Sequence, residues 1–272
     1  MALTTINSGG VKDDSIVNAD IKSDAAIAGS KVAPDFGSQN IITTGNVGIG
    51  TGSGTSTPLH VVGSDNTTTL LVESTDADAS VGPIIELFRN SGSPADNDAI
   101  GRIDFKCDDD AGNASSFARI AVTALDVSNG SEDAKIDFIA ATNDTFTPTM
   151  SITGQKVGIG TDSPSNKLHC VSSDYQTARF ESSAADANGT YIEMYANSSS
   201  PADNDILGIV SFRGNNSAAE QMAYAHVRAI ATDVTDGTED GAILFHTRSN
   251  GSFGERLRIT SGGISFNGDS AA

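Results

Sequence analysis

Residues 157–161 read Val-Gly-Ile-Gly-Thr, and the same five residues stand at positions 47–51. A second segment, Pro-Ala-Asp-Asn-Asp at 94–98, returns unchanged at 201–205. The distance along the sequence between matching residues is three residues shorter at the second segment than at the first, and it is constant from there on. Three single-residue deletions therefore separate the copies, and we expect them in turns, which tolerate deletions best. We therefore interpret residues 46–155 and 156–262 as two copies of one fold.

Apolar and polar residues alternate within each copy, which is the period of a β-strand. Ile103, Phe105 and Cys107, for example, are separated by charged residues. About seven or eight such segments per copy, bounded by Gly, Asn and Asp and without a helical period, predict two tandem antiparallel repeats of β-sandwich or jelly-roll type. The predicted strands are 59–62, 69–73, 84–89, 102–107, 117–125, 135–140, 149–153 and 156–159, with second-copy counterparts at 210–213, 224–231 and 242–247.

The two ends of the chain differ from the repeats. In residues 1–45 the apolar positions recur every 5 or 6 residues, which is neither a strand nor a helix period, so this leader is predicted to be an extended anchor that needs a partner surface. One short helix is predicted after Ser23, ended by Gly29. These apolar positions are Val11, Ile16, Ile21, Ile27 and Val32. Residues 263–272 are interpreted as the start of a third unit or as a terminal cap.

Charge excludes several classes of partner. Asp and Glu number 35 against 16 Lys and Arg, a net charge of −19, which opposes binding to nucleic acid or to anionic lipid. No apolar run approaches the ~20 residues of a membrane span, and the first six residues lack the features of a signal peptide. We therefore expect no nucleic-acid partner, no membrane insertion and synthesis in the cytoplasm.

The glycines of residues 45–54 do not form a phosphate-binding loop, because neither Gly-x-Gly-x-x-Gly nor Gly-x-x-x-x-Gly-Lys is present and no helix pattern follows. They fit a β-turn or a crowded crossing of chains, where only glycine has room. In the second case four residues would point toward a common axis: Val47, Ile49, Val157 and Ile159.

The histidines and cysteines form no recognisable chemical motif. His60 and His169 occupy the same repeat position, and no Ser or Cys nucleophile stands at a known spacing from either. The two cysteines, Cys107 and Cys170, suggest neither a disulfide framework nor a zinc site. We expect all four to be structural strand residues.

The acidic residues offer two further hypotheses. Asp108–Asp110 and the two Pro-Ala-Asp-Asn-Asp turns could hold calcium, but they lack the ligand spacing of a calcium loop, and turns in which Asp and Asn bond their own backbone are the default. Glu86 and Glu193 are repeat equivalents, and neither stands out as half of a glycosidase pair. No catalytic residue, cofactor or metal is therefore expected.

The repeated element itself resembles a known unit. Val-Gly-Ile-Gly-Thr followed by Ser/Thr-Pro and Leu-His, at 47–61 and more fully at 157–169, looks like the recurrent unit of bacteriophage tail fibre proteins, particularly those of marine cyanophages. The leader is similar to the N-terminal segments of the same fibres in residues 14–21, 25–31 and 33–41. Many such fibres end in an autocleaving chaperone domain, and nothing after Gly262 resembles one.

This resemblance implies a homotrimeric, non-catalytic fibre of the virion tail. Residues 1–45 would dock on a tail adaptor, nozzle or baseplate protein, and the distal parts would approach a host surface receptor such as a polysaccharide. The candidate docking residues are Ile16, Ile21, Ile27 and Val32. The low apolar content, 38% with 6% aromatic residues, independently favours burial between chains.

A second hypothesis is a carbohydrate-active tailspike or a lectin-like β-sandwich that binds sugar in a side groove. The absence of Trp weakens it, because sugar sites commonly use aromatic platforms.

Overall fold

The computed structural model describes residues 45–51, 57–185, 187 and 189–266, and in this part of the chain the only regular secondary structure is β-strand. The predicted all-β class is thereby confirmed. The strands are β1 (Val47–Ile49), β2 (Leu59–Val61), β3 (Ala99–Asp108), β4 (Ala114–Asp126), β5 (Asp133–Ala140), β6 (Pro148–Thr153), β7 (Lys156–Ile159), β8 (Leu168–Cys170), β9 (Ile206–Asn215), β10 (Gln221–Asp233), β11 (Asp240–Ser249), β12 (Ser252–Thr260) and β13 (Gly263–Phe266).

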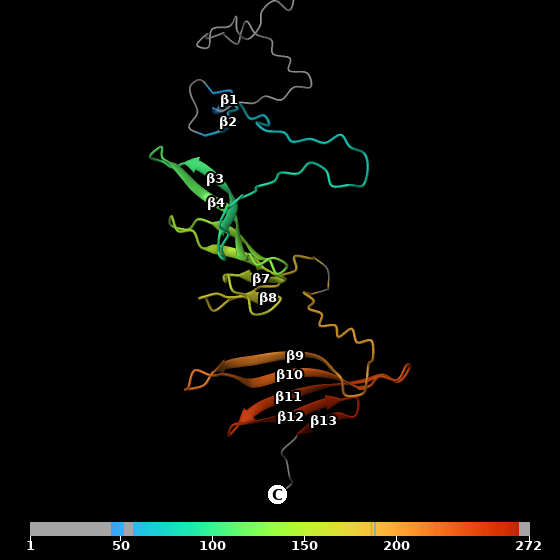
Figure 1. The fold of residues 1–272 in the computed structure, drawn as a ribbon. Helices are drawn as coiled ribbons and strands as arrows, with labels where there is room; N and C mark the ends of the chain where they lie inside the picture. Colours follow the sequence, from blue (N-terminus) through green and yellow to red (C-terminus); the bar gives the residue numbers. More distant parts are fainter. Residues whose placement is uncertain (1–44, 52–56, 186, 188, 267–272) are drawn as a thin grey trace, which may run out of the picture. The chain divides into compact units, whose positions relative to one another are not determined.

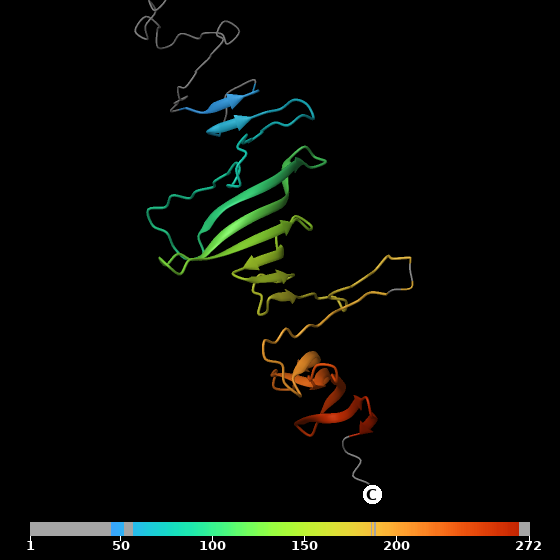
Figure 2. The same cartoon turned by 90° about the vertical axis from the view of Figure 1, so that its right-hand side faces the viewer.

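The strands form three sheets (Figure 1). β1 and β2 make a two-stranded parallel sheet within the unit that ends at Arg89. A six-stranded sheet has the order β3-β4-β5-β6-β7-β8, antiparallel except for the parallel pair β7-β8. A five-stranded antiparallel sheet has the order β13-β12-β11-β10-β9. Figure 2 shows the twist of the six-stranded sheet in green. A jelly-roll arrangement of the sheets stays a prediction.

The strands repeat at the displacement found in the sequence. β9 begins and ends at the positions that match the two ends of β3, and β10 matches β4 in the same way, whereas the short parallel pairs β1-β2 and β7-β8 match at a slightly larger displacement. The sheets are nevertheless offset from the sequence copies, because β7 and β8 open the second copy and complete the sheet of the first. β13, in the stretch predicted as the start of a third unit, occupies beside β12 the place that β7 has beside β6.

The glycines of the repeated pentapeptide are explained by local geometry. Gly50 and Gly160 have φ angles of +72° and +71°, and a Cβ at either would collide with a backbone carbonyl, that of Val62 or Val171 respectively. The amide of Gly160 also donates to the carbonyl of Thr149 at 3.0 Å. The positive φ angles and the close backbone carbonyls explain why glycine stands at both positions, and the choice between a β-turn and a crossing of chains stays a prediction.

The Pro-Ala-Asp-Asn-Asp turns fix the chain just before β3 and β9. In the second copy the amide of Asn204 donates to the carbonyl of Ala231, and the amide of Ala231 donates back to Asp205. The carboxylate of Asp203 accepts from the amide of Val234 at 3.0 Å. The first copy has the same three bonds. Each turn therefore sets the direction in which the preceding segment meets its sheet.

Two predicted strands of the first copy do not form. Residues 69–73 and 84–89 lie outside every strand, and the equivalent second-copy residues 177–181 and 191–196 do the same. Their apolar pattern is that of a strand, but within the described residues no backbone of the same chain pairs with them in a sheet. We call residues 63–98 and 171–205 arm 1 and arm 2, with residues 186 and 188 outside the described part. The predicted leader helix and Ile16, Ile21, Ile27 and Val32 also lie outside the described residues.

Candidate assembly surface

One face of the six-stranded sheet is apolar from edge to edge. Strand register places one residue of each strand in a continuous row, and directly opposed residues share a face. This first row is Ile103, Ile120, Phe138, Met150, Ile159 and Cys170. The neighbouring row on the same face is Gly101, Val122, Ile136, Ile152, Val157 and Leu168.

The five-stranded sheet repeats this face. Its rows consist of the second-copy equivalents of the first five residues in each row of the six-stranded sheet. One row is Val210, Val227, Phe245, Leu257 and Phe266, and the other is Gly208, Ala229, Ile243, Ile259 and Ile264. We call these two surfaces the apolar faces. The same apolar face is therefore present in both copies of the repeat.

The opposite face of the six-stranded sheet is polar and carries ion pairs and hydrogen bonds within the chain. Ser151 is fully buried and its hydroxyl donates to Asp137 Oδ1 at 2.6 Å, while Lys135 Nζ lies 3.1 Å from the other carboxylate oxygen. At the β3 end, Arg119 lies 3.2 Å from Asp104 and 3.6 Å above the ring of Phe146. Asp137 and Asp104 on this face are therefore paired within the chain.

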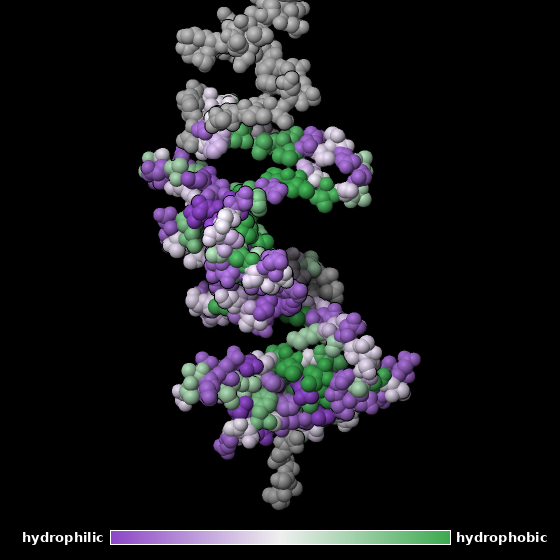
Figure 3. All heavy atoms as spheres, viewed as in Figure 1, coloured by the Kyte–Doolittle hydropathy of each residue, from purple (hydrophilic) through white to green (hydrophobic). Residues whose placement is uncertain are grey.

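Burial is the reverse of that in an ordinary soluble sheet, which turns its apolar face to the core and its polar face to water. Within the described residues, the buried hydrophobic cluster consists of Ile230, Ala242 and Leu244, and all three lie on the face opposite the apolar face of the five-stranded sheet. On the apolar faces Phe105 is 53% exposed and Phe266 is 66% exposed. Figure 3 shows apolar atoms gathered over β9 and β10.

Exposed apolar surface of this extent marks an interaction site. The predicted axis residues Val157 and Ile159 of β7 lie in the two rows of the first apolar face, and Ile159 is 44% exposed. Val47 and Ile49 occupy the equivalent places in β1, where Ile49 is 55% exposed. Whether these four side chains meet at a common axis stays a prediction.

The sequence alternation identified the apolar side of β3 but not its exposure. Ile103, Phe105 and Cys107 were expected to face one way, and the register agrees for the first two. The signal that the sequence analysis missed is that the apolar residues of all strands align in the same two rows.

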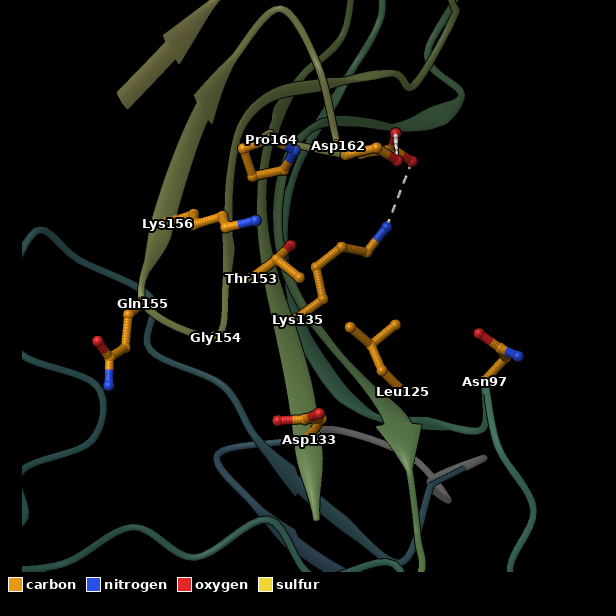
Figure 4. Close-up of a pocket in the computed structure, with 11 residues that line it drawn as sticks. Asn97, Leu125, Asp133, Lys135, Thr153, Gly154, Gln155, Lys156, Asp162 and Pro164 are labelled. Carbon is orange, nitrogen blue, oxygen red and sulfur yellow. Dashed lines mark hydrogen bonds and ion pairs between the residues drawn. The ribbon is translucent and has the colours of Figure 1, made fainter. Parts of the chain in front are cut away.

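The polar side carries a hollow of about 600 Å³ near the β5 and β6 ends (Figure 4). Lys135 points from β5 toward Asp162, 3.5 Å away. A hydrogen bond from Ser163 and the charge of Lys135 lower the pKa of Asp162. Lys156 also lines the hollow. In the second copy Ala242 stands in place of Lys135, so this charge arrangement belongs to the first copy alone.

The histidines lie in strands, as expected. His60 is in β2 and His169 in β8, where its Nδ1 accepts from the amide of Ser165 at 3.3 Å. His226 and His246 are opposed across β10 and β11, with a ring-centroid separation of 6.5 Å. Burial, assisted by the charge of Arg228, lowers the pKa of His246. This arrangement is a packed ring cluster without a nucleophile.

The cysteines and the acidic turns also follow their structural interpretation. Cys107 in β3 and Cys170 in β8 are free thiols. Asp109 accepts bonds from the amides of Asn113 and Ala111 at 2.8 and 2.9 Å, and the bonds from Asn113 lower its pKa. Within the described ranges, no group of three or more His, Cys, Asp or Glu residues is placed to hold a metal ion.

The fold has a counterpart among solved structures. No protein-family model matches the sequence, and no curated protein matches it. Among solved structures, the chain is similar to the carboxy-terminal domain of the bacteriophage T5 L-shaped tail fibre, with a TM-score of 0.57 and 10% sequence identity. The similarity covers 76% of this chain and 92% of that one. In the part of the chain that the structure describes, no helix is long and apolar enough to cross a membrane.

Proposed function

We propose that this chain is a structural tail fibre of a phage virion, assembled as a homotrimer, with no catalysis of its own. The observation that carries the proposal is the pair of equivalent apolar faces, each of which runs across every strand of its sheet and carries exposed apolar side chains. The fold similarity to a phage tail fibre domain supports the same class. The resemblance of the Val-Gly-Ile-Gly-Thr repeats to cyanophage fibres supports it from the sequence.

A closed assembly of identical chains buries such faces most simply, because each copy presents the same surface to the next. With three copies, the apolar faces turn toward a shared axis, and the polar face of the six-stranded sheet turns to water. The trimer then has a net charge of −57, because each of its three chains has a net charge of −19. This negative charge opposes side-by-side aggregation of fibres. A shaft of tandem β repeats results.

The ends of the fibre have separate roles in this proposal. Residues 1–45 dock on a tail adaptor, nozzle or baseplate protein through Ile16, Ile21, Ile27 and Val32. The β repeats form the shaft and its adhesive part, which approaches a receptor on the host surface. The protein is made in the host cytoplasm and resides in the virion tail.

Immunolabelling tests this function directly. Antibodies against residues 99–266 should decorate fibres on the tails of the virions that carry the protein when they are viewed by electron microscopy. Antibodies against residues 1–45 should label intact virions much less than the isolated protein, because docking covers the leader. Labelling of the capsid alone, or of no part of the virion, would contradict a tail fibre.

The polar hollow of the first copy favours a second candidate, a carbohydrate-active tailspike or lectin-like module. Its lining offers donors and acceptors from Asn97, Lys135, Gln155 and Lys156 on the face that the trimer leaves open to water. Incubation with a host-type polysaccharide separates the candidates. Released oligosaccharide would favour the tailspike. Binding without cleavage that is lost in both Lys135→Ala and Lys156→Ala would favour the lectin, whereas binding that survives both substitutions agrees with an adhesive fibre.

A further inference from the structure

The arms carry apolar side chains that a single copy leaves in water. Residues 191–195 of arm 2 read Tyr-Ile-Glu-Met-Tyr, with apolar residues on both sides of Glu193. The corresponding residues of arm 1, 84–88, read Ile-Ile-Glu-Leu-Phe. Nearly continuous apolar runs are typical of extended segments buried on both sides. The pattern is therefore kept through the duplication although neither segment forms a strand in its own chain.

One side of the arm 2 segment already lies on a sheet. The side chain of Met194 covers Gly208 of β9 so closely that a Cβ there would come within 3.0 Å of its Sδ. Because Gly208 belongs to the apolar face of the five-stranded sheet, Met194 lies on that face. An apolar hollow of about 290 Å³ beside it is lined by Val210, Val227 and Ile243 among others.

The other side of the segment remains open. Exposure alternates along it: Ile192 and Met194 are 62% and 53% exposed, whereas Tyr191 and Tyr195 are 81% and 78% exposed. The hydroxyl of Tyr195 bonds Asn197 at 3.4 Å, so its ring is available for packing. The turn at 201–205 anchors the end of arm 2 to β10, which limits how far the segment can move and so reduces the entropy lost when a partner binds.

We propose that residues 191–195 are a bridging element between copies: Ile192 and Met194 cover the apolar face of their own five-stranded sheet, and Tyr191 and Tyr195 pack against a second copy of this chain. The occupant is a second copy because each chain carries both complementary parts, an exposed apolar segment and an exposed apolar face with a hollow beside it. This inference rests on the proposed homotrimer and names the residues that link its subunits.

Photo-crosslinking tests the contact. One variant carries p-benzoylphenylalanine in place of Tyr191, and the matched control carries it in place of Tyr175, which lies on the same arm outside this segment and is 96% exposed. Irradiation of the full chain should give covalent dimers from position 191 and far fewer from position 175. Light scattering on the same samples reports whether the protein is trimeric.

The outcomes separate this inference from the proposed function. A trimer in which position 191 crosslinks only within its own chain, or not at all, overturns the bridging role and leaves the trimer standing. A monomer overturns both. In a second experiment, Tyr191→Ser should raise the dissociation constant by about 10- to 100-fold for each aromatic side chain that is lost from the interface, while Tyr175→Ser should leave it unchanged. Equal effects of the two substitutions would contradict the bridging role.

Discussion

Two neighbouring residues of β9 test the apolar face. Val210 lies in its row and is 44% exposed, while Ile209 is 39% exposed on the opposite face, beside Arg228. Covering the exposed part of Val210 is worth about 0.7 kcal/mol per copy, from about 1.5 kcal/mol for full burial. Three copies give about 2 kcal/mol, or roughly thirtyfold in the dissociation constant. Val210→Asp also buries an unpaired carboxylate in each copy, at a cost of several kcal/mol, so we expect dissociation.

Light scattering over a concentration series measures this effect, and circular dichroism confirms that each variant keeps its strands. Val210→Asp should be monomeric at concentrations where the unchanged chain is trimeric, whereas Ile209→Asp should remain trimeric. The nearly equal exposure of the two residues makes the comparison sensitive to the face alone. If both substitutions dissociate the protein, or if Val210→Asp stays trimeric, the apolar face is not the interface.

Three further predictions concern the chain itself. Ser151→Ala should lower the free energy of unfolding by about 1–3 kcal/mol in chemical denaturation without changing the oligomeric state, because Asp137 loses a buried donor; no loss would contradict the pairing of the polar face. Gly160→Ala should lower the melting temperature because of its positive φ and the carbonyl it would strike, whereas Gly254→Ala, with open space, should not; equal shifts would refute the turn argument. The lowered pKa of Asp109 gives stability that is present above its ordinary pKa of 3.8 and lost as the pH falls through the lower folded value, so Asp109→Asn should flatten the acid side of a melting-temperature profile, and an unchanged profile would contradict this.

Much of the architecture could be predicted from the sequence because it depends on local signals. Alternation between Arg102 and Cys107 identified a strand, and the constant displacement between the two copies identified its counterpart. The glycines at 50 and 160 were predicted to form either a β-turn or a crowded crossing of chains, and their positive φ angles and close backbone neighbours explain the need for glycine without deciding between the two. These features depend on a few neighbouring residues, which the sequence displays directly.

The strand predictions fail where a strand needs a neighbouring backbone to pair with. Residues 84–88 have the composition of a strand, yet strand formation requires a neighbouring backbone, and the described part of the chain offers none. The exposure of the apolar faces was equally hidden, since alternation says which side of a strand is apolar but not what covers it. Both discrepancies have one physical cause in this account: the partner surfaces belong to other copies, which a single sequence does not reveal.

Native mass spectrometry of the full chain tests the central claim most directly. If the apolar faces of three copies are buried together, the dominant species has three times the chain mass of 27.8 kDa, and it persists on dilution to low concentration. A species of 27.8 kDa alone, folded and soluble at high concentration, would show that a single copy tolerates both open faces and would contradict the account.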